Sequence, residues 1–489
     1  MIRRRHVLAG FAALTLLAVA FADLGAARPD PWLTLRAIGA GLLSPDFGDP
    51  WGLARATGLT VAFAVCGVAL GAVAGLLMAP LYHRTPVPLF CITIRAVHEL
   101  FWALLLLGIT GLSPLTGVLA IGVPYAGIFA KVFAEYLEEA PGTAPLPRGV
   151  PFVVQLLWVR LPQALPMMRT YTLYRLECGL RSSAVLGFIG LPTLGYQLET
   201  AFRQGLYGEA VAVLLLILAL ILPLRHWVIW RLVPLYLAAS IAALALVPTP
   251  PMGAGAVGRF LTGIVPAPLR TGADWGVWLD TVFVAQALPG SVATLVVSQI
   301  ALAGAAVLAA ALFPLIVRRV VGRVGAALGH GVLVVLRSIP DYMLAFVLLQ
   351  ILGPSMLPAV LALALHNGAI VAHLLGRQAD ALPQRTDAPQ GLTLWAWDLF
   401  PRLSGAFWAL CLYRWEIILR DSAIMGLLGI GTLGFYVQSN VATLRMDRVM
   451  ALLAVCVLLT LLVDTLSRRL RAAMRDGPAL RIEGANGMC

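Results

Sequence analysis

Charged residues are rare within the apolar stretches of this sequence, and two of them recur as a pair. Glu177 and Arg181 lie four residues apart, and Glu416 and Arg420 repeat that spacing. On a helix this spacing places both side chains on one face, where an ion pair makes their burial tolerable. In the alternative interpretation they line a polar pathway, where the arginine binds an oxyanion through charge-assisted hydrogen bonds. The sequence leaves both interpretations open.

Hydroxyl and acidic residues adjoin these pairs. Ser182 and Ser183 follow the first pair, and Asp421 and Ser422 follow the second. Serine hydroxyls donate hydrogen bonds either to a solute or to carbonyls of their own helix. Lys131 is another basic residue in an apolar stretch, either lining a polar pathway or marking a helix end toward the cytoplasm. The candidate pathway residues are therefore Glu177, Arg181, Ser182, Ser183, Glu416, Arg420, Asp421, Ser422 and Lys131.

The composition places these residues in a membrane protein. Of the 489 residues, 60% are hydrophobic and 12% are charged, whereas soluble domains carry about 25% charged residues. This excludes a soluble enzyme, a disordered chain and a disulfide-rich secreted scaffold. Twelve apolar stretches have the length that a helix needs to cross about 30 Å of hydrocarbon. We predict spans near 1–22, 56–79, 93–112, 115–137, 163–189, 208–224, 232–247, 289–316, 333–352, 356–376, 403–429 and 449–466.

The net charge of +12 indicates topology rather than nucleic-acid binding. If the N-terminus is cytoplasmic, 22 of the 35 basic residues fall in the cytoplasmic segments and at the cytoplasmic ends of the spans, and eight fall on the other side. This excess follows the positive-inside rule, and an even number of spans returns the chain to the same side. We therefore expect both termini in the cytoplasm, with membrane lipid and no nucleic acid as partner. The six cysteines form no CxxC motif, so we predict no metal and no cofactor.

The chain contains two copies of one unit. Residues 95–141 align with 337–383 at an offset of 242, and 173–196 align with 412–435 at an offset of 239. Identical pairs include Tyr174/Tyr413, Arg175/Arg414, Glu177/Glu416, Arg181/Arg420, Ser183/Ser422, Gly187/Gly426, Gly190/Gly429 and Gly195/Gly434. Six spans per copy give both copies the same orientation, which predicts parallel halves around an axis along the membrane normal. We place the units at 1–231 and 232–472, followed by a polar tail at 473–489.

Each copy also carries a polar cytoplasmic segment between its fourth and fifth span, at about 138–164 and 380–402. Each segment has a glycine, an amphipathic stretch and then a proline, at Gly149 and Pro162 in the first copy and at Gly391 and Pro401 in the second. One interpretation is a helix that lies on the membrane surface. The other is a coupling helix that docks onto a motor protein.

A known family has similar motifs. The stretch 160–190 (RLPQALPMMRTYTLYRLECGLRSSAVLGFIG) resembles the permease subunits of phosphonate-import ABC transporters, and so do RAVHELFWALLLLG, GVLAIGVPYAGIFAKVFAEYLEEA and VDTLSRRLR. The resemblance covers roughly 50–230 and 285–472. It implies the transmembrane fold of ABC type I importers, all-α with about twelve transmembrane helices, and two permease units fused in one chain.

The resemblance also implies the function. The chain would be a permease that imports a phosphonate or related phosphorus oxyanion across the inner membrane by alternating access. It would have no catalytic site, because ATP hydrolysis would belong to a cytoplasmic ATP-binding subunit dimer and capture to a periplasmic substrate-binding protein. The sequence has no GxxxxGK[ST] phosphate loop. The residues coupled to the ATPase would be Gly149, Pro162, Gly391 and Pro401.

The sequence departs from the family pattern at the coupling segments. The second is three residues shorter than the first, and Thr143-Ala144-Pro145 and Arg385-Thr386-Asp387 replace the family's Glu-Ala-Ala. An ABC permease for phosphite, phosphate or an amino acid is one alternative. An ion-coupled secondary transporter is the other, and it leaves the two polar segments without an explanation.

Overall fold

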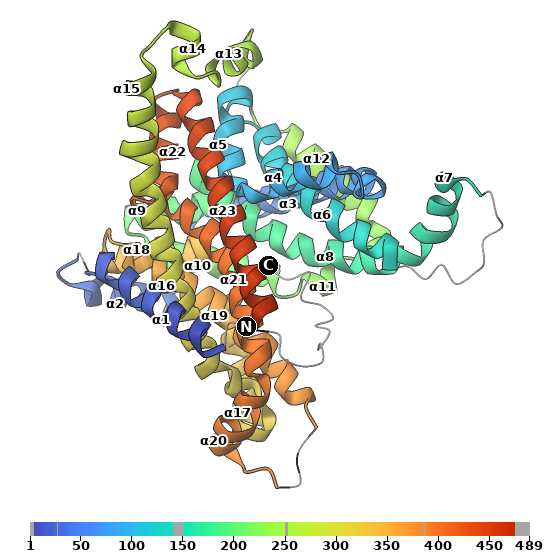
Figure 1. The fold of residues 1–489 in the computed structure, drawn as a ribbon, viewed down its shortest axis with the longest axis vertical. Coiled ribbons are helices and arrows are strands. Elements are labelled where there is room, and N and C mark those ends of the chain that lie inside the picture. The colour runs from blue at the N-terminus through green and yellow to red at the C-terminus, as the bar shows by residue number, and fades with distance from the viewer. Residues whose placement is uncertain are drawn as a thin grey trace. The chain divides into compact units, whose positions relative to one another are not determined.

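The computed structural model describes residues 4–26, 28–139, 150–249, 253–383, 385 and 387–474. Its regular elements within these ranges are all helical (Figure 1). Among the described residues, six helices are long and apolar enough to cross a membrane, and up to eight spans result if each of two bent helix pairs counts as one. The chain is therefore a helical, multi-pass membrane protein. The larger number of twelve spans stays a prediction.

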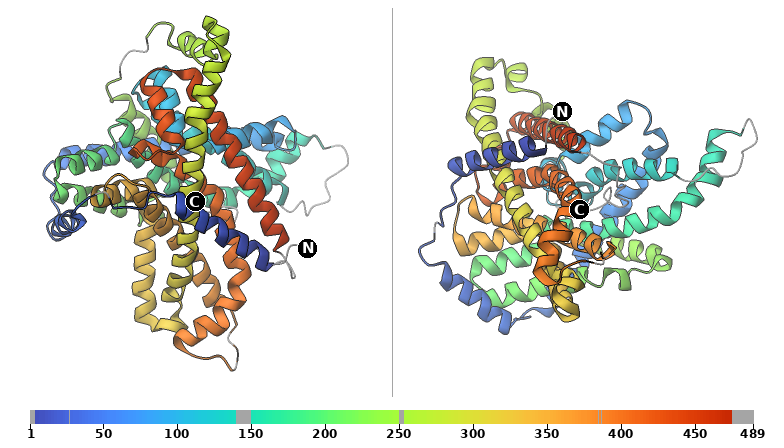
Figure 2. Two further views of the ribbon diagram at one scale, coloured as in Figure 1. Left: turned by 60° about the vertical axis from the view of Figure 1, so that its left-hand side comes forward. Right: turned by 60° about the horizontal axis from the view of Figure 1, so that its bottom comes forward.

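Contacts between residues divide the chain into two compact units. Figure 2 shows the helices of the chain from two further sides. The split unit combines the chain up to Ser44 with the chain from Leu261, and the continuous unit consists of Pro45–Phe260. The boundary that we predict at 231/232 follows the sequence repeat instead, and it stays a prediction.

The continuous unit is built around two long helices, α3 (Pro50–Met78) and α6 (Pro114–Glu139), which pack along each other. Gly67, Gly71 and Gly75 recur every fourth residue on the face of α3 toward α6. A methyl group at Gly71 would lie 2.7 Å from Cβ of Tyr125, so only glycine permits this close approach. Against this pair pack α4 (Pro86–Ala96), α5 (Glu99–Thr110), α8 (Leu161–Val185) and α12 (Val233–Ala245). The unit also contains η1 (Ala79–Leu81), α7 (Phe152–Gln155), η2 (Leu156–Arg160), η3 (Leu186–Ile189), α9 (Leu194–Gln204), α10 (Tyr207–Ile221), α11 (Leu224–Trp227), η4 (Trp230–Leu232) and most of α13 (Ala256–Gly263).

The split unit repeats this plan around α16 (Leu288–Leu312) and α19 (Leu357–Ala381). Against this pair pack α17 (Arg318–Ser338), α18 (Asp341–Leu352), α21 (Phe400–Ile424) and α1 (Arg4–Phe21). The unit also contains α2 (Pro31–Leu43), α14 (Ala267–Thr271), α15 (Trp275–Leu279), η5 (Asp280–Ala287), η6 (Phe313–Ile316), α20 (Gly391–Leu394), η7 (Trp395–Leu399), η8 (Met425–Leu428), α22 (Leu433–Ala442) and α23 (Met446–Ala473). Figure 1 shows α15 and α16 in line along one side.

Helix bounds recur at the offsets of the sequence repeat. The helices α8 and α21 differ by 239 at both ends (161 to 400 and 185 to 424), and α5 and α18 differ by 242 at both ends. The turn after α8 and α21 is also the same in both copies. Gly190 and Gly429 adopt positive φ values of 96° and 90°, which favour glycine. The hydroxyls of Thr193 and Thr432 then donate to carbonyls of Ala184 and Ala423, which closes each turn.

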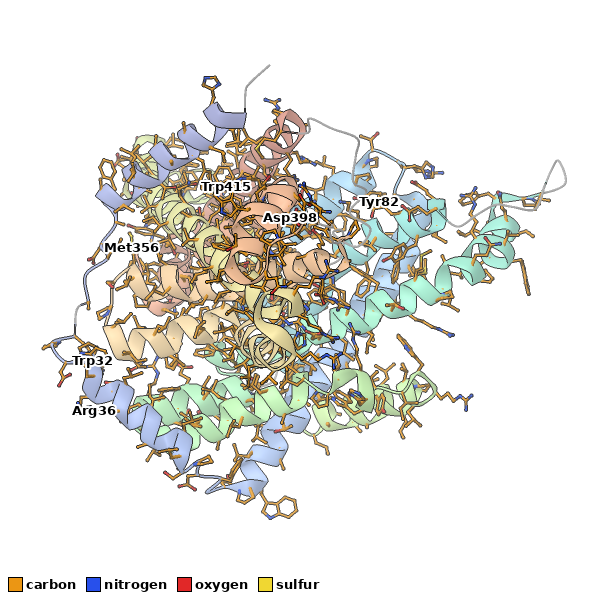
Figure 3. The ribbon with its side chains drawn as sticks, turned by 90° about the horizontal axis from the view of Figure 1, so that it is seen from below. Trp32, Arg36, Tyr82, Met356, Asp398 and Trp415 are labelled. Atoms are coloured by element: carbon orange, nitrogen blue, oxygen red, sulfur yellow. The ribbon has the colours of Figure 1, made fainter. Side chains whose placement is uncertain are left out.

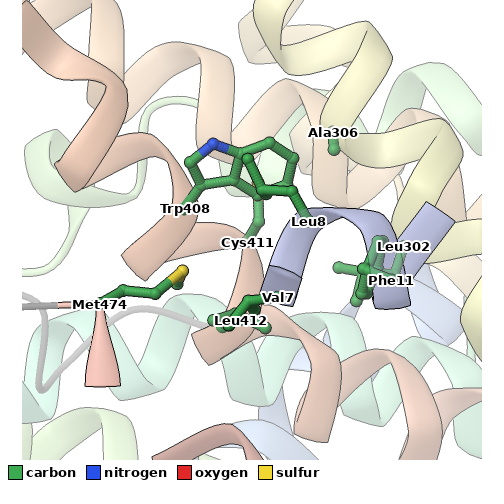
Figure 4. A pocket seen from close by; sticks show the side chains of 9 residues that line it. All are labelled: Val7, Leu8, Phe11, Leu302, Ala306, Trp408, Cys411, Leu412 and Met474. Atoms are coloured by element: carbon green, nitrogen blue, oxygen red, sulfur yellow. The ribbon is translucent and has the colours of Figure 1, made fainter. Parts of the chain in front are cut away.

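The helix at the start of each predicted half, 1–231 and 232–472, packs on a helix from the other half of the sequence. The helix α1 opens the first copy in sequence and packs on α16 in the split unit, where the Gln299 amide donates to the Thr15 hydroxyl at 2.9 Å. The helix α12 opens the second copy and packs on α3 in the continuous unit. A small apolar recess lies beside α1 (Figure 4). Its lining is Val7, Leu8, Phe11, Leu302, Ala306, Trp408, Cys411, Leu412 and Met474.

Short helices occur at 23–55 and 248–288, the segments that the predicted spans and a cytoplasmic N-terminus place on the side away from the cytoplasm. The Asp30 carboxylate accepts backbone N–H groups at the start of α2, and the Asp274 carboxylate does so for α15. Asp447 of α23 binds the second segment, because its carboxylate accepts the Trp278 indole N–H at 2.7 Å and the Ala267 N–H at 3.2 Å. These caps and contacts explain helices that are too short to be read from apolar periodicity.

Candidate functional site

Each predicted coupling segment ends in a π-helical turn. The turns η2 and η7 start at 156 and 395, again 239 residues apart, and lead directly into α8 and α21. Proline explains them, because Pro162 and Pro401 have no N–H to donate to the carbonyl four residues earlier. The preceding N–H groups, of Leu161 in the first copy and Phe400 in the second, bond five residues back instead. Turns of this kind are frequent at functional sites.

The π turns present large apolar side chains to the surroundings. Trp158 is 78% exposed and Trp397, at the matching position, is 80% exposed. Val153 and Leu392, another matched pair, are 59% and 69% exposed. Exposed aromatic residues at the same position of both copies are typical of a protein–protein interface.

The residues that define the coupling segments in the sequence lie at these turns where the structure describes them. Pro162 and Pro401 are exposed in the first turns of α8 and α21. Gly391 begins α20 with a φ of 61°, which favours glycine, and nothing lies within 4 Å of the place of a Cβ. Gly149 lies outside the described residues. In the second segment, two hydrogen bonds from Arg385 to Asp387 lower the pKa of that exposed carboxyl below 3.8.

Arg175, which the repeat pairs with Arg414, is enclosed by aromatic rings in the first copy. Its guanidinium lies 5.3 Å from the Tyr171 ring centre, 5.6 Å from Tyr125 and 5.8 Å from Tyr174. Its Nε donates to the Tyr171 hydroxyl at 2.8 Å. A cation–π contact of a desolvated guanidinium contributes about 2 kcal/mol or more to stability. These contacts make the buried charge tolerable.

Ser182 binds a carboxylate on another helix. Its hydroxyl donates to Glu99 at 2.6 Å and lies 3.4 Å from the Tyr125 hydroxyl. Glu99 begins α5 after a 91° bend from α4, and His98 next to it lies 3.6 Å from the other carboxylate oxygen. A carboxylate at a helix N-terminus is stabilised by the N–H groups there. The cluster therefore joins α5, α6 and α8 at a break in the helix path.

Glu177, Arg181 and Ser183, which are predicted pathway residues of the first copy, are partly or fully buried. Glu177 and Arg181 approach to 3.8 Å, as the ion-pair interpretation requires, with their side chains 27% and 12% exposed. Ser183 is fully buried and donates to carbonyls of Thr60 on α3 and Leu180 on its own helix.

The second copy differs at the matching positions. Asp421 replaces Ser182, and its carboxylate lies 3.8 Å from Arg420. Ser422 donates to the Ile418 carbonyl of its own helix at 2.6 Å. Glu416 is half-buried on α21. The two copies therefore present different polar groups on equivalent helices.

Lys131 lies on α6, where its side chain is 39% exposed and 3.8 Å from Glu135. The matching residue in the second copy, His373, is 5% exposed, and its ring centre lies 5.2 Å from that of His330. Lysine therefore takes part in a half-exposed ion pair, whereas histidine is packed inside the bundle.

The sequence-based list omits Glu99, His98 and Tyr125. A signal for Glu99 exists, because Asp341 stands at its repeat position and an acid inside a matched apolar stretch is uncommon. Asp341 begins α18 as Glu99 begins α5. Within the described ranges, no group of three or more His, Cys, Asp or Glu residues is placed to hold a metal ion.

Known proteins similar to this chain are transport permeases. A phosphate-import permease protein of Mycolicibacterium smegmatis is 26% identical over 486 residues, which cover 88% of each chain. A phosphite transport system permease protein of Stutzerimonas stutzeri is 31% identical over 37% of this chain and 70% of its own. A putative cryptic phosphonate transport system permease protein of Escherichia coli is 31% identical over 21% of this chain and 85% of its own.

No family model matches the sequence, and no solved structure matches it. The three relatives nevertheless belong to one class of protein, since all are permease proteins named for phosphorus oxyanions. One of them aligns with nearly the whole chain, as two fused permease units require. The chain belongs to the family of phosphate, phosphite and phosphonate permease subunits of ABC transporters.

Proposed function

We propose that the chain is the complete membrane pair of an ABC importer for a phosphonate or related phosphorus oxyanion. The observation that carries the proposal is the alignment with a phosphate-import permease over 88% of both chains. Each half would contribute six spans, with both termini in the cytoplasm and the protein in the inner membrane. The recurrence of helix bounds at offsets of 239 and 242 supports two homologous halves.

The segments that contain the π turns η2 and η7 would move with the ATP-binding subunits when ATP is hydrolysed. A cytoplasmic ATP-binding subunit dimer would bind Trp158 and Trp397, and Gly149, Pro162, Gly391 and Pro401 would shape the two docking helices. The exposure of both tryptophans supports this role, because no described residue covers most of their surface. A periplasmic substrate-binding protein would deliver the solute to the opposite face.

The buried polar groups would form the pathway for the oxyanion. Arg181 and Arg420 would supply positive charge, with Lys131 at the cytoplasmic end of α6. Ser182 and Asp421 would make the two halves chemically different, since one carries a hydroxyl and the other a carboxylate. Each partner protein shifts the permease between inward-open and outward-open states only by binding one of them more tightly.

Co-purification and uptake test the proposed function. We expect tagged permease, expressed with the neighbouring genes, to bring down an ATPase and to import radiolabelled methylphosphonate, phosphite or phosphate in proteoliposomes with ATP. Uptake should stop with a non-hydrolysable ATP analogue and continue when an ionophore abolishes the proton gradient. Uptake that needs the proton gradient and not ATP would instead identify an ion-coupled transporter.

Substitution of the repeated arginines tests the pathway. We expect Arg181→Ala and Arg420→Ala each to lower the uptake rate about tenfold, which corresponds to about 1.4 kcal/mol in the transport barrier. The yield of folded protein should fall less than the uptake rate, because the carboxylates of Glu177 and Asp421 lie 3.8 Å from these arginines, near the ion-pair limit of about 4 Å. Size-exclusion yield and uptake are measured on the same preparations. Equal losses of both would assign these residues to the fold alone.

A further inference from the structure

The second coupling segment is tied to the membrane helices by two arginines. Arg402 on α21 donates to the Asp398 carboxylate at 3.1 Å and to the Pro383 carbonyl at 3.2 Å. Arg319 on α17 donates to the Leu382 carbonyl at 2.9 Å and to the Asp380 carbonyl at 3.3 Å. We call Arg319, Asp398 and Arg402 the arginine brace.

The brace joins the two ends of the segment. Pro383 lies just after α19, where the segment begins. Asp398, which is labelled in Figure 3, lies in the π turn where the segment ends. A single guanidinium, that of Arg402, bonds both. The carbonyls to which the two arginines donate lie at the C-terminal end of α19, where cations are favourable and carbonyls lack helical partners. The base of the loop is therefore closed by side chains.

The ion pair of Asp398 and Arg402 is largely buried, whereas Trp397, which it helps to position, is exposed. The Asp398 side chain is 7% exposed and that of Arg402 is 30% exposed. Directly before Asp398, Trp397 is 80% exposed. A charge as buried as that of Asp398 depends on its partner, so the ion pair fixes the turn that carries the tryptophan.

The first copy lacks the residues that would build this pair. At the offset of 239, Val159 stands in place of Asp398 and Gln163 in place of Arg402. The π turn and its exposed tryptophan are nevertheless present in both copies. The Asp398–Arg402 pair is thus not needed to form the turn, and a role in holding the two ends of the second segment together remains for it.

We propose that the arginine brace is a positioning device that makes the second half the rigid arm through which ATP hydrolysis moves the permease. This inference rests on the proposed function. The brace residues do not touch the solute or the nucleotide. They hold Trp397 in a preset place, so that movement of the ATP-binding subunit is passed to α19 and α21 rather than absorbed by the loop.

The experiment measures solute imported per ATP hydrolysed, in proteoliposomes that contain the full permease with its ATP-binding subunits and binding protein. The solute is whichever of phosphate, phosphite and methylphosphonate the unaltered protein imports fastest. The double variant Asp398→Asn with Arg402→Gln removes both charges without leaving one unpaired. We expect its imported solute per ATP to fall about fivefold or more, within the range of typical coupling effects, while ATP hydrolysis stays within about twofold.

Two further variants complete the test. Arg319→Gln leaves the Asp398–Arg402 pair intact but removes two hydrogen bonds to the loop base. It should also lower the amount of solute imported per ATP. This variant keeps the inference testable if the double variant fails to fold. Arg385→Gln is the matched control, because it breaks an exposed ion pair in the same segment that reaches neither membrane helix. It should leave the ratio unchanged.

Three results would overturn the inference: an unchanged ratio in the double variant and in Arg319→Gln, an equal fall in Arg385→Gln, or a parallel fall in transport, hydrolysis and thermal stability. Failure of the proposed function is seen separately, since the unaltered protein would then show no ATP-driven uptake at all.

Discussion

Gly187→Ala is expected to prevent stable folding. A Cβ at this position would fall against the backbone N of Tyr196 and within 2.6 Å of the Gly195 carbonyl carbon. Backbone atoms of a closed turn cannot move aside as a flexible side chain does. The substitution should therefore lower the free energy of unfolding by about 3 kcal/mol or more. Gly426→Ala should fail in the same way, since its Cβ would meet the corresponding atoms of Phe435 and Gly434. Size-exclusion yield in detergent and the thermal unfolding midpoint measure the effect.

Gly405→Ala is the matched control for these two variants. Gly405 lies on α21, and no atom lies within 4 Å of the place of its Cβ. Alanine there should leave the protein folded and raise its stability by up to about 1 kcal/mol through helix propensity. If Gly187→Ala and Gly426→Ala unfold at the same temperature as Gly405→Ala, the prediction that the closely packed turn requires glycine is wrong.

The double variant Trp158→Ala with Trp397→Ala should lower ATP-driven uptake by at least tenfold while the unfolding midpoint barely changes. Both side chains are about four-fifths exposed, so they add little to the packing of the permease. Tryptophans at the centre of an interface commonly contribute about 2 kcal/mol or more to binding. Their loss should therefore weaken binding of the ATP-binding subunit more than the loss of other side chains. Uptake, and the amount of ATP-binding subunit that co-purifies, measure the result.

Trp51→Ala serves as its control. Trp51 is 87% exposed at the start of α3, at the end of that helix that we predict to face away from the cytoplasm. Its loss should not affect the amount of ATP-binding subunit that co-purifies. If the double variant retains both uptake and the ATPase, then the π-turn segments are not the docking surface.

Much of the fold is predictable from the sequence because it follows from local rules. Long apolar stretches predict α3, α6, α16 and α19, and the register of the repeat predicts that α8 and α21 match. The short helices in the external segments are not predictable in this way. The helix α2 depends on Asp30 as its N-cap, and α14 and α15 are held by Asp447, which is 169 residues from Trp278 in sequence.

The candidate site shows the same division. The ion pair of Glu177 and Arg181 follows from a spacing of four residues on one helix, and the structure has it at 3.8 Å. The hydrogen bond from Ser182 to Glu99 joins residues 83 apart and depends on the bend before α5, which no local pattern fixes. The brace is equally non-local, because Arg319 reaches carbonyls 61 and 63 residues further along the chain.

The packing of α1 on α16 sets an order of events during synthesis. The helix α1 ends at Phe21 and α16 begins at Leu288, so 267 residues (288 minus 21) must be made before its packing partner exists. At about 5–20 residues per second, α1 waits roughly 13–53 s without that partner. The Thr15 hydroxyl donates to the Phe11 carbonyl of its own helix, which satisfies the hydroxyl during that time. The helix α1 is therefore synthesised well before the helix on which it packs.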